Sequence, residues 1–360
     1  MREDGDIDSA GHARHSALRA DRMLIRARAP LRISFAGGGT DVPPFCDQEG
    51  GCVLSATITR YAYGSLGDRD DGQIHIESLD FGVTATFSAD APMELDGNLD
   101  LVKAAISRMH DEAKGFDLFL HSDAPPGTGL GASSAMVVCL VGLLADWRSD
   151  RMTDYQIADV AHTVERKELG ILGGYQDFYA AAFGGFNFIE FLPGRVVVNP
   201  LRMPESTVNE LQYNLLLVYT GKVRLSSNII EDQVARYEAG ESDSQDALRE
   251  LKALTVEMKE ALLHRKLDEF GRLLHDEWEH KKRMSPRISH AYLDDLYDTA
   301  RKEGALGGKI TGAGGGGYML LYCPFDKKHR IAERLTEMGC SIASFGFDLN
   351  GLQTWRADHG

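Results

Sequence analysis

The residues Gly127–Ala135 have the types and the order that suit the binding of a phosphate group. Glycines let backbone N–H groups approach an anion closely, and a helix that starts directly after them adds partial positive charge. The apolar run Met136–Trp147 follows at once and predicts that helix, in a buried position. Ser133 and Ser134 lie where it begins. A serine hydroxyl there can ligate a Mg²⁺ ion that bridges phosphates, or it can simply cap the helix.

A second glycine cluster covers Gly307–Tyr318 and includes four consecutive glycines, Gly314–Gly317. Such a run carries a heavy cost in conformational entropy, whereas a plain turn needs only one or two glycines. We therefore expect close approach to a ligand or to another part of the backbone. A third cluster, Gly37–Gly39, is followed by Thr40 and Asp41.

Four charged residues near these clusters carry groups that can act in group transfer. Asp177 ends the turn Gly173–Asp177, and Glu165 lies twelve residues earlier on a predicted helix. Arg32 and Asp41 flank the third glycine cluster. Each also has an ordinary interpretation: Asp177 as a helix cap, Glu165 as part of a solvated charged face, and Arg32 with Asp41 as a surface pair. The residue types alone leave both interpretations open.

Two common nucleotide motifs do not fit. A Walker loop needs a lysine followed by serine or threonine, but Lys309 precedes Ile310 and lacks the upstream glycine. The Rossmann spacing is met from Gly127 to Ala132. However, two prolines separate that stretch from the preceding strand, and the region near Trp147 looks like a helix end rather than the end of a second strand.

Strands and helices that alternate along the chain must position these groups. The hydrophobic patterns predict strands at Leu24–Ser34, Val53–Leu66, Gln73–Ser78, Val83–Ser88, Asp117–Ser122, Tyr213–Tyr219 and Tyr318–Tyr322. They predict helices at Leu99–Glu112, Met136–Trp147, Thr153–Gly170 with Thr153 as its cap, Asn228–Gly240, Ser242–Leu274 and Ile288–Glu303. The stretch Gly173–Glu190 reads as a turn, a short helix and a strand.

The pattern of predicted secondary structure changes near Pro204, from mixed strands and helices to mostly helices. For 360 residues this predicts two α+β domains with a cleft between them. The expected boundaries are 1–22 for a disordered tail, 23–204 for an N-terminal domain that binds the nucleotide, and 205–360 for a C-terminal domain.

Composition excludes several classes of partner. A formal net charge of −15 argues against nucleic acid, whose phosphates need a basic surface. We see no apolar run of about 18 residues that would span a membrane, and residues 1–22 lack the apolar core of a signal peptide. The five cysteines are scattered without a C-x-x-C pair, as expected for reduced thiols in a cytoplasmic protein. A small-molecule partner fits best, and a homodimer stays open.

Three motifs in this order resemble the GHMP kinase superfamily, which includes galactokinase and the homoserine, mevalonate and phosphomevalonate kinases. They are Pro30–Asp41, Pro126–Ala135 and Lys309–Tyr318, and the resemblance extends from Arg28 to about Asp348. It implies a two-domain fold with the active site in the cleft between an N-terminal α/β domain and a C-terminal α+β domain. It also implies ATP and Mg²⁺ as cofactors.

The resemblance further implies roles for individual residues. Asp177 would orient the acceptor hydroxyl and accept its proton, Arg32 would face the transferring phosphoryl group, and Ser133 and Glu165 would hold Mg²⁺. The ATP phosphates would lie in the loop formed by Pro126, Gly127, Thr128, Gly129, Leu130, Gly131, Ala132, Ser133 and Ser134. Substrate binding would fall to Gly38, Gly39, Thr40, Asp41, Arg224, Gly314 and Gly315.

Within the superfamily, several stretches are most similar to the D-glycero-D-manno-heptose 7-phosphate kinases, including Gly37–Asp41, Gln176–Asn187 and Trp278–Ser285. This similarity implies phosphorylation of the anomeric hydroxyl to a 1,7-bisphosphate, in the synthesis of nucleotide-activated heptose. The distal phosphate would need cations, for which Lys222, Arg224 and Lys281–Arg283 are candidates, although the last three can equally form a solvated face.

One position departs from that group, because Tyr175 stands where a lysine is common. The departure puts the exact acceptor or the turnover in question. Three alternatives therefore remain at this point. They are another sugar-1-kinase (for fucose, galactose or unphosphorylated heptose), a catalytically silent sugar-binding regulator, and an NAD-dependent dehydrogenase that uses Gly127–Ala132.

Overall fold

The computed structural model describes residues 24–80, 82–110, 113–221 and 227–357. Its strands are β1 Leu24–Ala36, β2 Gly51–Arg69, β3 Gln73–Ser78, β4 Val83–Ser88, β5 Gly115–Ser122, β6 Phe186–Leu192, β7 Arg195–Pro200, β8 Leu215–Tyr219, β9 Gly307–Ile310, β10 Tyr318–Tyr322, β11 Ser341–Ala343 and β12 Gln353–Ala357. Its helices are α2 Phe45–Glu49, α3 Asp100–Met109, α4 Ala132–Trp147, α5 Asp154–His162, the π-helix η1 Thr163–Glu168, α6 Gln176–Phe183, α7 Glu205–Asn214, α8 Ser227–Glu238, α9 Ser242–Leu263, α10 Leu267–Met284, α11 Ala291–Lys302 and α12 Lys328–Glu337.

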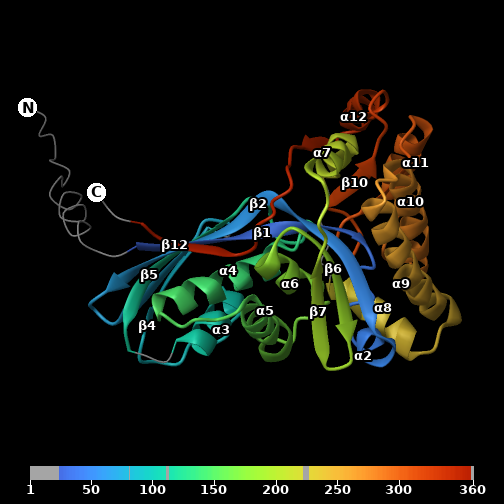
Figure 1. Cartoon of the computed structure of the whole chain (residues 1–360). Helices are drawn as coiled ribbons and strands as arrows, with labels where there is room; N and C mark the ends of the chain where they lie inside the picture. Colours follow the sequence, from blue (N-terminus) through green and yellow to red (C-terminus); the bar gives the residue numbers. More distant parts are fainter. Residues whose placement is uncertain (1–23, 81, 111–112, 222–226, 358–360) are drawn as a thin grey trace, which may run out of the picture.

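The larger sheet has the strand order β12-β1-β2-β5-β3-β4, and β6 and β7 continue from β2. Its two long strands, β1 and β2, reach from the end near the chain termini to helices α9 and α10 (Figure 1). Burial alternates along β1 from Leu24 to Ala29, as the period of two requires for a strand with one face on a core, whereas every residue from Ala29 to Ala36 is buried. Pro30 sits at a register shift in the β1–β2 ladder, where its missing N–H costs least.

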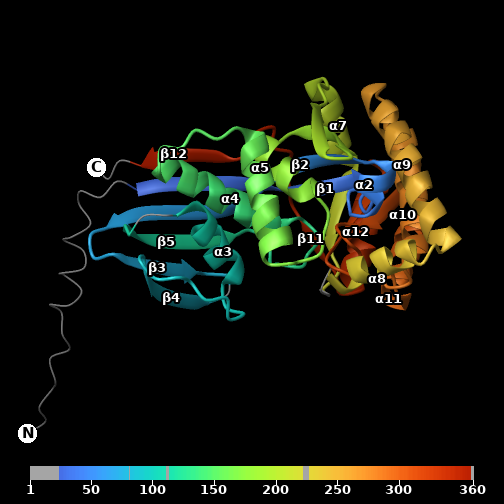
Figure 2. The same ribbon diagram turned by 90° about the horizontal axis from the view of Figure 1, so that it is seen from below.

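Helices α3, α4, α5 and α6 lie together on one side of this sheet (Figures 1 and 2). Helix α4 is buried around most of its circumference, which explains the unbroken apolar run in its sequence. The predicted cap of the next helix is confirmed, since Thr153 forms a capping box with Gln156. That helix does not continue unchanged to Gly170, however, because it passes into η1 after His162.

The smaller sheet has the order β11-β8-β10-β9 with antiparallel neighbours. Helices α9 and α10 pack against each other, and α10 lies against β9. The charged helical region predicted at Ser242–Leu274 is confirmed as helical, but it is not a single element and it continues to Met284. It is two helices, separated at Arg265, whose φ of 60° cannot continue an α-helix. The prediction also missed α7, so the strand expected from Tyr213 begins only at Leu215.

The fold is α+β, as expected from the sequence. The C-terminal half of the chain also contributes to the larger sheet, because β12 pairs with β1. None of the helices in the described part of the chain has the length and apolar character needed to span a lipid bilayer.

Candidate active site

A cavity of about 210 Å³ opens where the three glycine clusters meet the turn before α6. Many of the residues predicted from the sequence line it, namely Arg32, Gly38, Gly39, Asp41, Gly127, Gly129, Gly131, Ala132, Ser133, Ser134, Glu165, Asp177 and Gly314. Other predicted residues belong to the same loops but do not line this cavity, namely Thr40, Pro126, Thr128, Leu130 and Gly315. Arg224 lies outside the described residues.

The loop before α4 depends on its glycines for backbone conformation. Gly127, Gly129 and Gly131 have φ values of 78°, 85° and 73°, a region that residues with a Cβ rarely adopt. Gly131 is the residue that caps α4. Neither Ser133 nor Ser134 is therefore the cap, and both hydroxyls are free for other contacts.

The second glycine cluster packs directly on the first. A Cβ added at Gly129 would lie 2.3 Å from the carbonyl oxygen of Thr311, and one added at Gly317 would lie 2.4 Å from that of Thr128. The N–H of Tyr318 donates to the Thr128 carbonyl at 3.1 Å. The expected close approach to another backbone is confirmed. It brings the loops before α4 and β10 together on one side of the cavity.

Glu165 and the two serines form one hydrogen-bonded group. Ser133 Oγ donates to Glu165 Oε1 at 3.0 Å, and Ser134 Oγ donates to Oε2 at 2.8 Å. Glu165 is buried and lies on η1, and π-helical turns recur at functional sites. The interpretation of Glu165 as part of a solvated face is therefore wrong.

The same group fits a magnesium ion. Two ligand oxygens at 2.0–2.1 Å on adjacent corners of an octahedron lie roughly 3 Å apart, and Ser133 Oγ and Glu165 Oε1 are separated by 3.0 Å. Within the residues that the structure describes, no three His, Cys, Asp or Glu side chains gather as a metal site. A serine and a single glutamate are enough where substrate phosphates and waters complete the shell of Mg²⁺.

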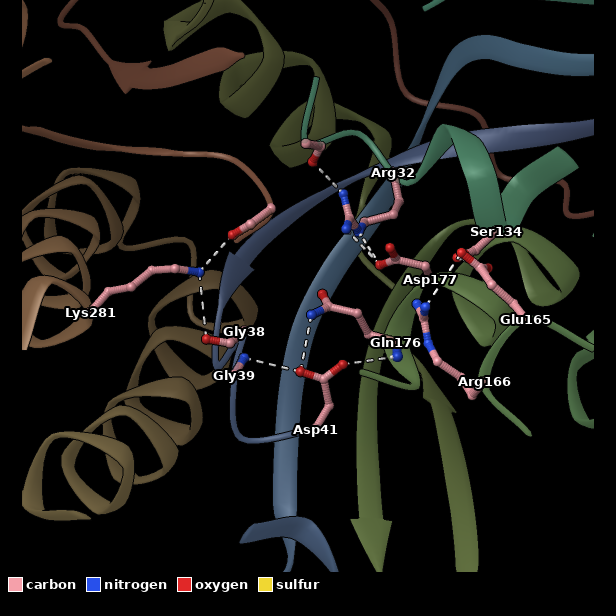
Figure 3. Close-up of polar contacts among 12 residues, drawn as sticks. Arg32, Gly38, Gly39, Asp41, Ser134, Glu165, Arg166, Gln176, Asp177 and Lys281 are labelled. Carbon is pink, nitrogen blue, oxygen red and sulfur yellow. Dashed lines mark hydrogen bonds and ion pairs between the residues drawn. The ribbon is translucent and has the colours of Figure 1, made fainter. Parts of the chain in front are cut away.

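Asp177 is held by Arg32. Arg32 Nε and Nη2 contact Asp177 Oδ1 at 2.8 and 2.6 Å, and Arg32 Nη1 donates to the Gly129 carbonyl at 2.6 Å (Figure 3). In the described part of the chain Asp177 Oδ2 has no hydrogen bond, although it lies near Gly131. Asp177 is in the first turn of α6 and does not cap it. The arrangement leaves one carboxylate oxygen available beside the phosphate loop.

Asp41 is completely buried, so it is not part of a surface pair with Arg32. Its Oδ1 accepts from the Gly39 N–H and from Gln176 Nε2, and its Oδ2 accepts from the Gln176 N–H. Burial raises the pKa of the Asp41 carboxyl group above its usual value, although these backbone hydrogen bonds oppose the shift. The carboxyl group joins the third glycine cluster to the turn that carries Asp177. Gly174 leaves room for it, because a Cβ there would lie 1.9 Å from Asp41 Oδ2.

Of the three basic residues Lys281–Arg283, only Lys281 lines the cavity. Its Nζ donates to the Gly312 carbonyl at 2.8 Å and to the Gly38 carbonyl at 3.5 Å. Burial lowers its pKa to about 7. Lys282 pairs with Glu279, and Arg283 pairs with two acidic residues at the surface.

Sequence reasoning missed several residues that line the cavity, among them Arg166, Gln176 and Gln233. Arg166 and Gln176 stand directly beside predicted site residues in the sequence, and that adjacency was the available signal. Gln233 lies on α8 and had no such signal. Tyr175, the departure noted in the sequence, does not line the cavity but stacks on His162, with ring centroids 4.1 Å apart.

Fold and site together define an enzyme that transfers a phosphoryl group to a small molecule. The chain belongs to the GHMP kinase family, whose sequence models match residues 100–185 (GHMP kinases N terminal domain) and 258–339 (GHMP kinases C terminal). It is 37% identical to the D-glycero-alpha-D-manno-heptose 7-phosphate kinase of Campylobacter jejuni, over 92% of this chain and 99% of that protein.

Two solved structures illustrate the likeness. The first is a D-glycero-D-manno-heptose 1-phosphate kinase from Bacteroides thetaiotaomicron. It has a TM-score of 0.78 and 34% identity, and the match covers 92% of this chain and 98% of that one. Lactococcus lactis galactokinase complexed with galactose has a TM-score of 0.74 at 21% identity, with 92% and 95% of the chains covered. At this lower identity, the likeness to galactokinase shows a shared fold alone.

Proposed function

We propose that this chain is an ATP- and Mg²⁺-dependent sugar kinase that phosphorylates the anomeric hydroxyl of D-glycero-D-manno-heptose 7-phosphate, giving the 1,7-bisphosphate. One observation carries the proposal. A single cavity holds Asp177, which is fixed by Arg32, together with the glycine loop before α4 and the hydrogen-bonded pair of Ser133 and Glu165. An acceptor hydroxyl, a phosphoryl group and a metal ion can meet there.

The nucleotide has room in two adjoining hollows. A second cavity of about 320 Å³ shares Ala132 and Ser133 with the first, and much of its wall is apolar, including Leu99, Leu120 and Met136. A flat adenine ring suits such a wall, since ligand pockets are mostly apolar with few polar groups. The phosphates would then follow the loop before α4 into the polar cavity.

Phosphoryl transfer asks a protein mainly to position groups and to neutralise charge. Ser133 and Glu165 would hold Mg²⁺, which supplies positive charge to the phosphate oxygens when it is bound. Asp177 Oδ2 would accept the proton of the anomeric hydroxyl as its oxygen bonds to the γ-phosphorus and the bond to ADP breaks. Arg32 keeps the other carboxylate oxygen in place and brings a guanidinium to the same side of the cavity.

The names of the relatives support the acceptor. Both the Campylobacter and the Bacteroides proteins are named as heptose phosphate kinases, although the names differ in the position of the phosphate. Asp41 and the Gly38–Gly39 segment would bind the sugar, with Asp41 acting through Gln176 as well as directly. Arg224 stays a prediction as a ligand of the distal phosphate.

A second candidate is L-fucose 1-kinase activity. The chain is 27% identical to the bifunctional fucokinase/GDP-fucose pyrophosphorylase of Arabidopsis thaliana, and it spans about a third of that protein's length. The acceptor screen described next separates the two candidates.

The test is a screen of C6 and C7 sugars, each with and without its terminal phosphate, in which ADP release is measured and the product is located by phosphorus NMR. We expect the largest kcat/KM for heptose 7-phosphate and a new anomeric phosphate. Preference for fucose, galactose or free heptose would overturn the acceptor and leave a sugar kinase. Binding of NAD in place of ATP, or no turnover of any sugar, would overturn the kinase itself.

A further inference from the structure

Three cationic side chains line the cavity in the described part of the chain, and two of them contact carboxylates. Arg32 contacts Asp177, and Arg166 Nη1 lies 3.3 Å from Glu165 Oε1. Within the described residues, Lys281 Nζ donates hydrogen bonds only to the carbonyl oxygens of Gly38 and Gly312. Of these three side chains, Lys281 is therefore the one whose positive charge is not offset by a contacting carboxylate.

Lys281 enters the cavity from α10, on the opposite side from Glu165 and Ser134, with Asp177 and Asp41 between them (Figure 3). If the nucleotide phosphates lie at the Ser133–Glu165 end of the cavity, the opposite end, beside Lys281, is left for the acceptor sugar. The lysine is 3% exposed and bridges two glycine clusters. A buried ammonium group is costly without an anion or several hydrogen bonds, so this position is well suited to a ligand that brings negative charge.

Other buried polar atoms converge on the same spot. A Cβ added at Gly38 would lie 3.3 Å from Lys281 Nζ and 3.5 Å from both Gln176 Nε2 and Ser34 Oγ. Ser34 Oγ and Gln176 Oε1 are buried and have no hydrogen-bond partner among the residues that the structure describes. Buried polar atoms are normally paired. A donor hydroxyl at Ser34 and an acceptor at Gln176 suit a group that carries both phosphate oxygens and sugar hydroxyls.

We propose that Lys281 forms the anion subsite of the acceptor: its ammonium group binds the phosphate ester that the sugar carries away from the reacting hydroxyl. This inference rests on the proposed function and adds the residue that selects a phosphorylated sugar over a free one. It also separates Lys281 from Lys282 and Arg283, which bind acidic side chains elsewhere.

The charge state of Lys281 gives the subsite a pH dependence. Burial lowers its pKa to about 7, and the charged groups that face it are Lys309 and Arg32, which lower the pKa further, and Glu277 and Asp41, which raise it. Only the protonated lysine attracts a phosphate. Preference for the phosphorylated sugar should therefore fall as pH rises above 7, a range in which the ester, with a second pKa of roughly 6, stays a dianion.

The experiment compares kcat/KM for heptose 7-phosphate and for free heptose in the wild-type enzyme, Lys281→Met, Lys281→Arg and the control Lys282→Met. A charge-assisted hydrogen bond contributes enough for the ratio of the two values to fall roughly tenfold or more in Lys281→Met. Lys282→Met should keep the wild-type ratio. Equal losses on both sugars in Lys281→Met would overturn the subsite and make Lys281 a support for the glycine loops.

The wild-type enzyme supplies a second test that needs no variant. Its kcat/KM ratio should decline between pH 7 and 9, because kcat/KM reports groups of the free enzyme. Lys281→Arg, whose guanidinium stays charged, should remove that decline. A ratio that is flat in the wild-type enzyme, or a decline that persists in Lys281→Arg, would overturn the inference. If the wild-type enzyme phosphorylates no sugar phosphate, the proposed function falls, and this subsite falls with it. If it does and only the ratios fail to respond, the subsite alone is wrong.

Discussion

Replacement of Asp177 by asparagine should separate its part in catalysis from its part in stability. Asparagine keeps the size of the side chain and an oxygen that can accept from Arg32, but it removes the charge and the ability to take a proton. General-base assistance contributes about 10²–10⁴-fold to a rate. We therefore expect kcat to fall by that amount, with a much smaller change in the binding of ATP.

The cost in stability follows from the ion pair. The side chains of Arg32 and Asp177 are 5% and 19% exposed, so the guanidinium stays buried after the substitution. Loss of one partner of a buried pair costs about 3–5 kcal/mol. The cost should be lower here, about 1–3 kcal/mol, because the asparagine oxygen remains and Arg32 also donates to Gly129.

The assay measures ADP release at saturating ATP and sugar, together with urea unfolding and the binding of a fluorescent ATP analogue. Asp159→Asn is a matched control, since Asp159 accepts from Tyr179 on the neighbouring helix and does not line the cavity. It should lose some stability and keep its kcat. A kcat of Asp177→Asn within about tenfold of the wild-type value would refute the reasoning and leave Asp177 as a structural partner of Arg32.

Further predictions concern the metal site and the packing beneath it. Ser133→Ala should raise the Mg²⁺ concentration for half-maximal activity roughly tenfold or more, and earlier melting with an unchanged Mg²⁺ profile would make Ser133 purely structural. Gly129→Ala should unfold more easily than Gly194→Ala by about 1–3 kcal/mol in urea titrations. Both glycines have positive φ but only Gly129 would clash, so equal losses would contradict the packing argument. Glu277→Ala should cost about 3–5 kcal/mol, because it leaves Lys309 buried without its partner. A loss below about 1 kcal/mol would contradict a buried charge pair.

Much of the candidate site was visible in the sequence because its signals are local. A glycine that needs a positive φ, a serine at a helix start and an aspartate in a tight turn all depend on near neighbours. The loop before α4 and its glycines were predicted on that basis, and the structure shows the required φ values. The strands β3 and β4 were predicted with their bounds for the same reason, since alternation is read residue by residue.

The errors have equally physical causes. The break at Arg265 lies between two helices of similar polarity, so no change in the hydrophobic pattern marked it. The π-helical turn that carries Glu165 also leaves no mark in the hydrophobic pattern. The boundary between domains at residue 204 is not among these errors and stays a prediction, because it rests only on the change from mixed strands and helices to mostly helices along the sequence. A short strand such as β12 can pair with the larger sheet without altering that pattern of predicted secondary structure.

The sequence by itself determined which chemical groups are present and which backbone segments can bend around a phosphate. Only the tertiary structure decided which groups meet. Arg32 and Asp177 are 145 positions apart, and their contact depends on how β1 and α6 pack. Lys281 and Lys282 are adjacent and chemically identical, yet successive residues of a helix point about 100° apart. The packing of α10 against β9 and the glycine loops therefore places one lysine inside the cavity and leaves the other outside it.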